Sequence, residues 1–125
     1  MVKKKVTNND SAALVELIVK GIQDKHGKQI VSLKLGILPN MVCEYFVICH
    51  GTSRTQVEAI ADAVEHYVKT NLGQKVWHRE GFENSEWLLL DYSDVVVHIF
   101  QEETRDFYRL EKLWADAGRT DYATV

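Results

Sequence analysis

The sequence predicts an α/β domain in which helices flank a single-layer, mixed, five-stranded sheet. This class is indicated because segments with apolar residues at helical spacing are interspersed with short segments rich in β-branched residues. The chain has 125 residues, of which 46% are hydrophobic and 26% charged, and these values are typical of one soluble globular domain. We therefore expect a single domain over residues 1–125, with an ordered core at about 11–117 and loose ends at 1–9 and 118–125.

The elements are expected in the order α-β-β-α-β-β-β-α. The first helix is marked by apolar residues at helical spacing and by Gly27, which can provide a left-handed end. The second helix opens with the spacing of a capping box, Ser53 and then Gln56, and Gly73 can end it. In chain order, the segments are residues 11–26, 29–35, 44–49, 51–73, 75–80, 86–91, 95–100 and a last helix from 101 onward.

Short runs of aliphatic and aromatic residues identify the strands. The run from Tyr45 to Ile48 is apolar on both faces, which is typical of an internal strand. The last two runs are separated only by Tyr92-Ser93-Asp94, and so short a turn predicts a hairpin. The helix that follows has acidic residues in its first turn, which suit its positive end. Its buried side should be formed by Phe107, Leu110, Leu113 and Trp114.

Composition and charge argue against several classes of function. Fifteen Lys and Arg against eighteen Asp and Glu give a net charge of −3, whereas a dedicated nucleic-acid binder carries a positive excess that displaces phosphate counterions. No apolar run approaches the roughly 20 residues that span a bilayer, and no apolar segment follows the basic run from Lys3 to Lys5. Cys43 and Cys49 lack the spacing of a metal or redox pair, so we expect two reduced core residues in a cytoplasmic protein.

The predicted order resembles the nucleotidyltransferase-like fold, which raises the possibility of a metal-dependent transferase. Such enzymes carry two carboxylates at alternate positions of one strand, where both can hold Mg²⁺ against a triphosphate. Here Val96 occupies the alternate position after Asp94, and Asp91 lies across the predicted turn. Because no other catalytic, cofactor or metal motif is found, we expect no enzyme, no cofactor and no metal site. His98, alone in an apolar strand, is interpreted as a hydrogen-bonded core residue.

Acidic and aromatic residues are concentrated between Glu80 and Glu103. This stretch has seven Asp and Glu residues and no Lys or Arg, and it includes Phe82, Trp87 and Tyr92. Negative charge repels nucleic acid and attracts a basic protein, for which exposed aromatic side chains provide anchors. The alternative is that acidic residues keep loop ends solvated beside buried strands. Trp87 favours a protein-binding surface, since its place beside an acidic residue at a strand start argues against full burial.

Two segments, GTSRTQVEAIAD (51–62) and EWLLLDYSDVVVHIFQEETRDFYRLEKLWADA (86–117), closely resemble the ribosomal silencing factor family, also called RsfS or Iojap-related. The likeness runs from about Ala13 to Ala117. It implies a cytoplasmic, non-catalytic factor, commonly a homodimer, with the nucleotidyltransferase-like fold but no working active site. It also implies binding to ribosomal protein uL14 (L14) on the large subunit, where the factor sterically blocks joining of the small subunit and lowers translation when nutrients are scarce.

The resemblance also implies a set of site residues. The uL14-facing patch would include Trp87, Tyr92 and Tyr108, and an acidic surround would include Glu86, Asp91 and Asp94. The aromatic side chains would lose water against uL14, while the acidic side chains would pair with its Lys and Arg residues. Two other functions stay open at this point: a nucleotide-handling enzyme and a binding module for another basic protein.

This chain departs from the family pattern at three places. Ser93 stands where Gly is usual, so a positive φ at this turn would be less comfortable. Cys43-Glu44 replaces a Thr-Asp pair that is frequent before the second strand, and His50 replaces a small residue. These departures bear on local geometry more than on function.

Overall fold

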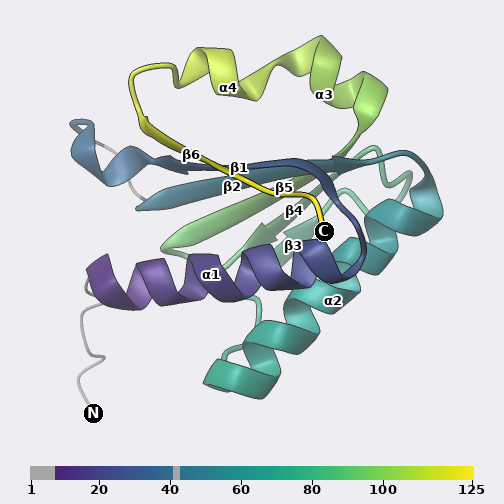
Figure 1. The fold of residues 1–125 in the computed structure, drawn as a ribbon, viewed down its shortest axis with the longest axis horizontal. Helices are drawn as coiled ribbons and strands as arrows, with labels where there is room; N and C mark the ends of the chain where they lie inside the picture. Colours follow the sequence, from purple (N-terminus) through teal and green to yellow (C-terminus); the bar gives the residue numbers. More distant parts are fainter. Residues whose placement is uncertain (1–7, 41–42) are drawn as a thin grey trace.

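The computed structural model describes residues 8–40 and 43–125 of the chain. Its elements are, in chain order, α1 (Asn8–Asp24), β1 (Lys28–Lys34), the 3₁₀ turn η1 (Leu35–Ile37), β2 (Tyr45–Gly51), α2 (Arg54–Leu72), β3 (His78–Glu80), β4 (Trp87–Asp91), β5 (Val95–Gln101), α3 (Glu102–Tyr108), α4 (Leu110–Leu113) and β6 (Gly118–Tyr122). They build one sheet with the strand order β3-β4-β5-β2-β1-β6 (Figure 1). The predicted α/β class with a mixed sheet is confirmed, although the sheet has six strands instead of five.

The sheet is mixed because one pair of neighbours, β2 and β5, is parallel, whereas the other neighbouring strands are antiparallel. The predicted hairpin of β4 and β5 is confirmed, and in its turn Tyr92 N donates to Val95 O at 2.9 Å. The strand expected at residues 75–80 is shorter than predicted, since only β3 pairs with β4. At its other edge the sheet ends with β6, which pairs with β1.

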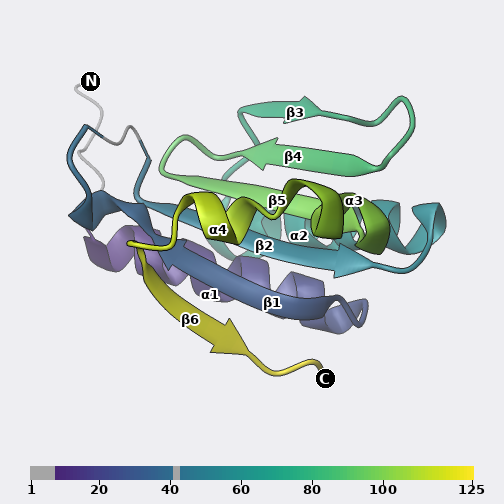
Figure 2. The same ribbon diagram turned by 90° about the horizontal axis from the view of Figure 1, so that it is seen from above.

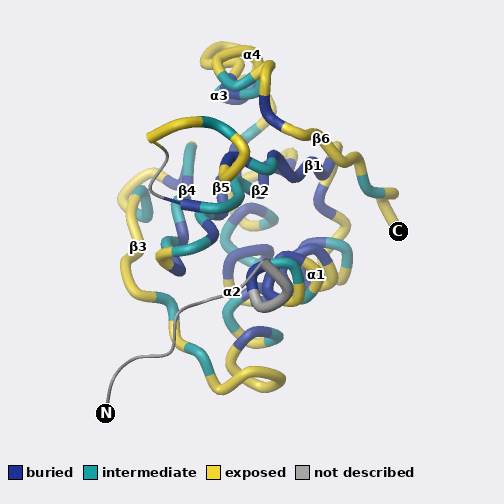
Figure 3. Tube along the Cα trace, turned by 90° about the vertical axis from the view of Figure 1, so that its left-hand side faces the viewer, coloured by how far each residue is buried: buried dark blue, intermediate teal, exposed yellow. Residues whose placement is uncertain are grey.

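Helices cover the two faces of the sheet unequally. The long helices α1 and α2 pack on one face, and the short helices α3 and α4 lie over the other (Figure 1). The larger apolar core lies under α1 and α2 and includes Ile18 and Val97. A smaller core lies under α3 and α4 and includes Ile48 and Phe100. In Figure 3 the inner sides of α1 and α2 are buried, whereas α3 and α4 are largely exposed.

The predicted ends of α2 are confirmed in detail. Ser53 Oγ accepts a hydrogen bond from Gln56 N at 3.1 Å, and Gln56 Oε1 accepts one from Thr52 N at 2.8 Å. The first bond satisfies an amide that the first turn of a helix leaves without a partner, as the capping box predicts. In the second bond Gln56 reaches Thr52, one residue before the N-cap, and not the amide of the N-cap itself. At the other end Gly73 has the left-handed φ of 65°. The end of α1 differs from the prediction, because the left-handed residue is His26, with φ 60°, and not Gly27.

The predicted last helix is broken into α3 and α4. Arg109 between them has φ 49°, a left-handed conformation that ends one helix before the next begins. The expected apolar side is therefore wrong in part, because the break interrupts the helical spacing. Leu110 is buried and Trp114 half-buried, but Phe107 is 79% exposed and Leu113 is exposed as well.

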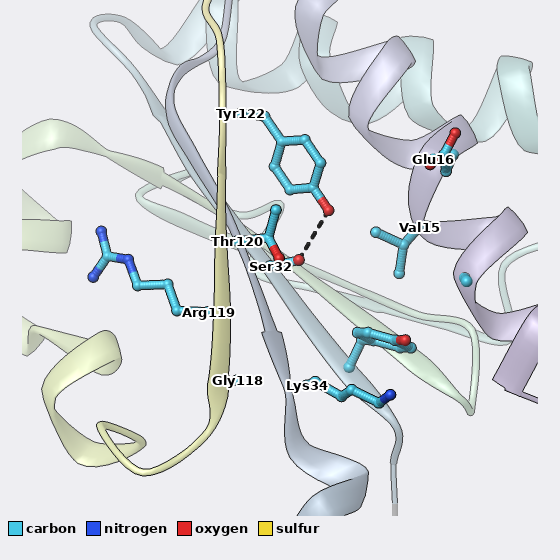
Figure 4. Close-up of a pocket in the computed structure, with 10 residues that line it drawn as sticks. Val15, Glu16, Ser32, Lys34, Gly118, Arg119, Thr120 and Tyr122 are labelled. Carbon is cyan, nitrogen blue, oxygen red and sulfur yellow. Dashed lines mark hydrogen bonds between the residues drawn. The ribbon is translucent and has the colours of Figure 1, made fainter.

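The C-terminal residues form a strand, which corrects the expectation of a loose end at 118–125. β6 pairs antiparallel with β1, and Ser32 Oγ and Tyr122 OH share a hydrogen bond of 2.9 Å. Figure 4 shows these two side chains facing a hollow of about 280 Å³ between β6 and α1. At the other end, residues 1–7 of the expected loose segment lie outside the described residues, and α1 begins at Asn8.

Both cysteines are buried and free, as predicted. Cys49 packs in the core under α1 and α2, and burial raises its pKa to about 12. Cys43 packs in the core on the opposite face, where burial and nearby carboxylates raise the pKa of its thiol to about 11. Thiols with such pKa values stay protonated at neutral pH and are poor nucleophiles, so both residues act as small apolar side chains.

Candidate functional site

The sheet face that carries α3 and α4 is only partly covered. Figure 2 shows these helices above β5 and β2, whereas no helix lies over β4 and β3. Side chains at alternate positions of β4 and β5 point to this face and lie opposite each other across the two strands. We call this partly covered region the open face, and its residues are Phe46, Trp87, Leu89, Asp91, Val96 and the buried His98.

Trp87 is half-buried at the centre of an aromatic cluster. Its ring centroid lies 4.8 Å from that of Phe100 and 5.0 Å from that of Tyr108. Its indole Nε1 donates a hydrogen bond to His98 Nδ1 at 3.0 Å. Phe107, the next residue on α3, has its ring centroid 5.0 Å from that of Tyr108. The structure thus brings Trp87 and Tyr108 together and adds the exposed Phe107 beside them.

Tyr92 does not belong to this surface, which corrects the patch implied by the resemblance. Its side chain is only 2% exposed and packs in the core under α1 and α2. Trp87 and Tyr92 are an odd number of residues apart along an extended segment, so their side chains point to opposite faces of the sheet. Burial also raises the pKa of the Tyr92 hydroxyl well above its usual range. Tyr92 is a core residue.

The expected acidic surround is divided between the two ends of β4. Glu86 is exposed at the Trp87 end, whereas Asp91 and Asp94 lie at the other end, next to the β4–β5 turn. Asp91 Oδ1 accepts a hydrogen bond of 2.7 Å from the backbone N–H of Ser93. Ser93 has φ 76°, so it adopts the positive φ that is less comfortable for Ser than for the Gly of the family pattern. The side chain of Asp91 therefore helps hold a turn whose backbone favours glycine.

A hollow of about 420 Å³ lies at the Asp91 end of the open face. Its lining residues are Cys43, Phe46, Trp77, Leu89, Asp91, Ser93, Val96 and His98. Trp77 is 77% exposed, and its backbone N–H donates to Asp91 O at 2.8 Å. The sequence interpretation did not single out Trp77. Its alternation with Val76 in the predicted half-exposed strand is the one signal that could have identified it.

One carboxylate, that of Asp91, lines this hollow directly. The negative charges of Asp91, Glu44 and Asp94, in this order, add to the effect of burial in raising the pKa of Cys43, which is also in the lining. In the described part of the chain none of the three takes part in an ion pair. An apolar hollow with unneutralised acidic groups around it attracts a cationic partner and repels an anionic one.

Comparison with known proteins identifies the family of this chain. A family model described as "Ribosomal silencing factor during starvation" matches residues 8–125. The chain belongs to the ribosomal silencing factor family. Curated RsfS proteins of Halalkalibacterium halodurans and Bacillus subtilis are 42% and 40% identical over 90% and 87% of this chain, and 94% and 91% of their own. A crystal structure from Chromobacterium violaceum has 33% identity and a TM-score of 0.78, over 83% of this chain and 85% of that one.

In this silencing-factor chain, a buried arginine holds α3 and α4 on the sheet. The Arg105 side chain is 4% exposed, and its Nη2 lies 2.6 Å from Glu111 Oε2 on α4. Its Nη1 donates to His50 Nδ1 at 3.0 Å and to Lys28 O at 3.4 Å, which joins α3 to β2 and β1. His50, a departure from the family pattern, thus serves as an acceptor. Burial and the Arg105 charge keep its pKa below the usual value, which favours the neutral form that can accept.

The site of this family member is suited to contact with a partner protein. Within residues 8–40 and 43–125, no three His, Cys, Asp or Glu side chains are grouped so that they could hold a metal ion. Asp91 ends β4 and Asp94 precedes β5, so the two do not occupy alternate positions of one strand. None of the described helices has the length and apolar character needed to cross a membrane. The features that remain are half-buried aromatic rings, an apolar hollow and free carboxylates.

Proposed function

We propose that this chain silences translation by binding ribosomal protein uL14 on the large subunit and thereby blocking joining of the small subunit. One observation carries the proposal: exposed aromatic side chains of α3 lie beside Trp87, on the sheet face that helices only partly cover. Membership of the ribosomal silencing factor family supports a ribosomal partner. The resemblance of residues 51–62 and 86–117 to the family supports uL14 as the protein that is bound.

The docking surface of this proposal consists of the open face together with Phe107 and Tyr108. Phe107 loses much of its contact with water on binding, because it is 79% exposed in the free chain. Truncation of such an aromatic anchor typically costs about 2 kcal/mol of binding free energy. The carboxylates around the hollow attract Lys and Arg side chains of the partner and speed the encounter. Tyr92 takes no part in the contact, because it is buried on the other side of the sheet.

Silencing then follows from occupancy alone. A protein seated on uL14 covers surface that the small subunit needs, and no bond is made or broken. We further infer, from the resemblance, that the factor acts in the cytoplasm and that free molecules form homodimers. Sedimentation equilibrium of the purified chain tests the homodimer, which gives twice the monomer mass of 14.4 kDa.

Sedimentation of purified ribosomal subunits tests the central proposal. We expect the chain to migrate with large subunits and to reduce their reassociation with small subunits. Phe107→Ala should weaken binding about 30-fold, the equivalent of 2 kcal/mol. Leu72→Ala is the matched control, since Leu72 is an exposed apolar residue at the end of α2, away from the docking surface.

Three results would contradict this function. Subunits that still pair freely at saturating protein would exclude silencing by steric block. Capture of a basic protein other than uL14 would indicate a different binding module. Thermal stabilisation of the chain by a nucleotide with Mg²⁺ would favour the nucleotide-handling alternative, because a ligand stabilises the folded state that binds it.

A further inference from the structure

A buried histidine, His98, lines the hollow at the Asp91 end of the open face. The hydrogen bond that it accepts from Trp87 determines which of its two ring nitrogens carries the proton. His98 is 4% exposed and lines the hollow. The indole Nε1 of Trp87 donates to His98 Nδ1 at 3.0 Å. An indole N–H is a donor only, so Nδ1 must act as the acceptor, and the proton of the neutral imidazole must be on Nε2. Burial supports the neutral form, because it lowers the pKa of His98 to about 4.

The Nε2–H donor of His98 has no acceptor in the described part of the chain. Nearly all buried polar groups in folded proteins have a hydrogen-bond partner, so one that lacks a partner indicates a missing contact. Phe46 packs against the imidazole, with ring centroids 4.5 Å apart, and Leu89 and Val96 add apolar walls. These side chains offer no lone pair for the donor. A molecule that enters the hollow can provide one.

The surroundings of the hollow restrict which acceptor can enter. Asp91 lines the hollow, and the charges of Glu44 and Asp94 act together with it on Cys43, another lining residue. None of the three carboxylates forms an ion pair in residues 8–40 and 43–125. Their negative charge repels a carboxylate or phosphate. A neutral carbonyl oxygen is compatible with them, above all when a Lys or Arg follows in the same segment and can reach Asp91.

We propose that His98 is a specificity-determining residue of the docking surface, and that the hollow receives a carbonyl oxygen from a basic loop of the partner. The carbonyl accepts the hydrogen bond from His98 Nε2, and a neighbouring Lys or Arg pairs with Asp91. This inference rests on the proposed function, because the loop belongs to uL14. Nε2 has no contact with solvent in the free chain, so side chains of the hollow must shift as the loop enters.

Two substitutions test the roles of the two ring nitrogens of His98 separately. In His98→Asn, the amide oxygen can replace Nδ1 and accept from Trp87, but the side chain no longer reaches the position of Nε2. In His98→Gln, the longer amide can place its N–H near the position of Nε2, while the acceptor for Trp87 is lost. We expect His98→Asn to weaken uL14 binding about 10-fold and His98→Gln to stay within about 3-fold of wild type. His66→Asn is the control, because His66 is exposed on α2.

Binding of purified uL14 is measured for the four proteins by titration calorimetry, with thermal unfolding to confirm that each is folded. Wild-type chain that fails to bind uL14 overturns the proposed function and this inference with it. Wild-type binding that His98→Asn leaves unchanged overturns the role of His98 alone.

Proton–nitrogen NMR of the imidazole tests the same role in the wild-type chain, should either variant unfold. The free chain must show the proton on Nε2, and uL14 must shift this signal downfield and slow its exchange with water. A proton on Nδ1, or a signal that uL14 does not change, overturns the inference.

Discussion

Replacement of Arg105 by Met is expected to loosen the attachment of α3 and α4 to the sheet. Met has a similar length and keeps the apolar contacts of the side-chain stem, but it has no N–H groups. The carboxylate of Glu111 would lose a partner at 2.6 Å, and His50 Nδ1 would lose a donor at 3.0 Å. Because these groups connect α3, α4 and β2, the loss acts on the segment that presents Phe107 and Tyr108.

The size of the effect follows from burial. Removal of one partner from a buried ion pair costs roughly 3–5 kcal/mol, because the remaining charge is left without compensation. The Glu111 side chain is 18% exposed, so water can solvate part of the freed carboxylate, and the lower end of the range applies. We expect a loss of about 3 kcal/mol in the free energy of unfolding, and a melting temperature lower by roughly 10 °C for a domain of this size.

Urea unfolding and thermal unfolding measure the loss, and hydrogen exchange locates it. Arg119→Met is the matched control, because the Arg119–Asp121 pair is exposed and should contribute less than about 1 kcal/mol. The double variant Arg105→Met with Glu111→Leu removes both charges and should recover part of the loss. If Arg105→Met destabilised the chain no more than Arg119→Met, or if the second substitution recovered nothing, the role of Arg105 as an anchor would be refuted.

Three further substitutions or conditions test other parts of the structure. The pKa of His98 is about 4 in the folded chain against 6.5 for an ordinary histidine, so the unfolded state binds more protons between these values. Stability should therefore fall by about 3 kcal/mol as the pH falls from 7 to 4, and urea unfolding of His98→Phe should show a flatter pH dependence. Ser93→Gly should raise the free energy of unfolding by about 0.5–1 kcal/mol, because Ser93 has φ 76°, and an unchanged melting temperature would contradict this strain. Tyr92→Phe should leave uL14 binding unchanged and the free energy of unfolding equal or higher, because the buried hydroxyl has no hydrogen-bond partner among the described residues. Weaker uL14 binding by a folded variant would show that Tyr92 belongs to the docking surface.

Features that depend on neighbours in the chain were predictable. The capping box at Ser53, the left-handed Gly73 and the β4–β5 hairpin are each formed by residues a few positions apart, so their signals are complete in a short segment. The strand β6 is different. Its sequence, Gly-Arg-Thr-Asp-Tyr, shows little apolar alternation. It becomes a strand because it pairs with β1, which lies in the N-terminal part of the chain.

The break between α3 and α4 could not be predicted from the sequence either. Helical spacing continues through Arg109 in the sequence, yet the left-handed conformation of Arg109 ends α3, which the buried Arg105 holds against β1 and β2. Phe107 and Leu113 become exposed as a result. The same break turns what would have been core residues into surface that a partner can contact.

For the site, the amino-acid sequence already contains the chemical character of the surface: an acidic stretch with aromatic residues and without the paired carboxylates of a transferase. Alternation along β4 was also present in the sequence, and it already separates Trp87 from Tyr92. Which of these two residues is accessible depends on how the helices pack on the sheet, and the sequence does not reveal that packing. The helices α1 and α2 pack over the face with Tyr92, whereas α3 and α4 leave the face with Trp87 partly uncovered.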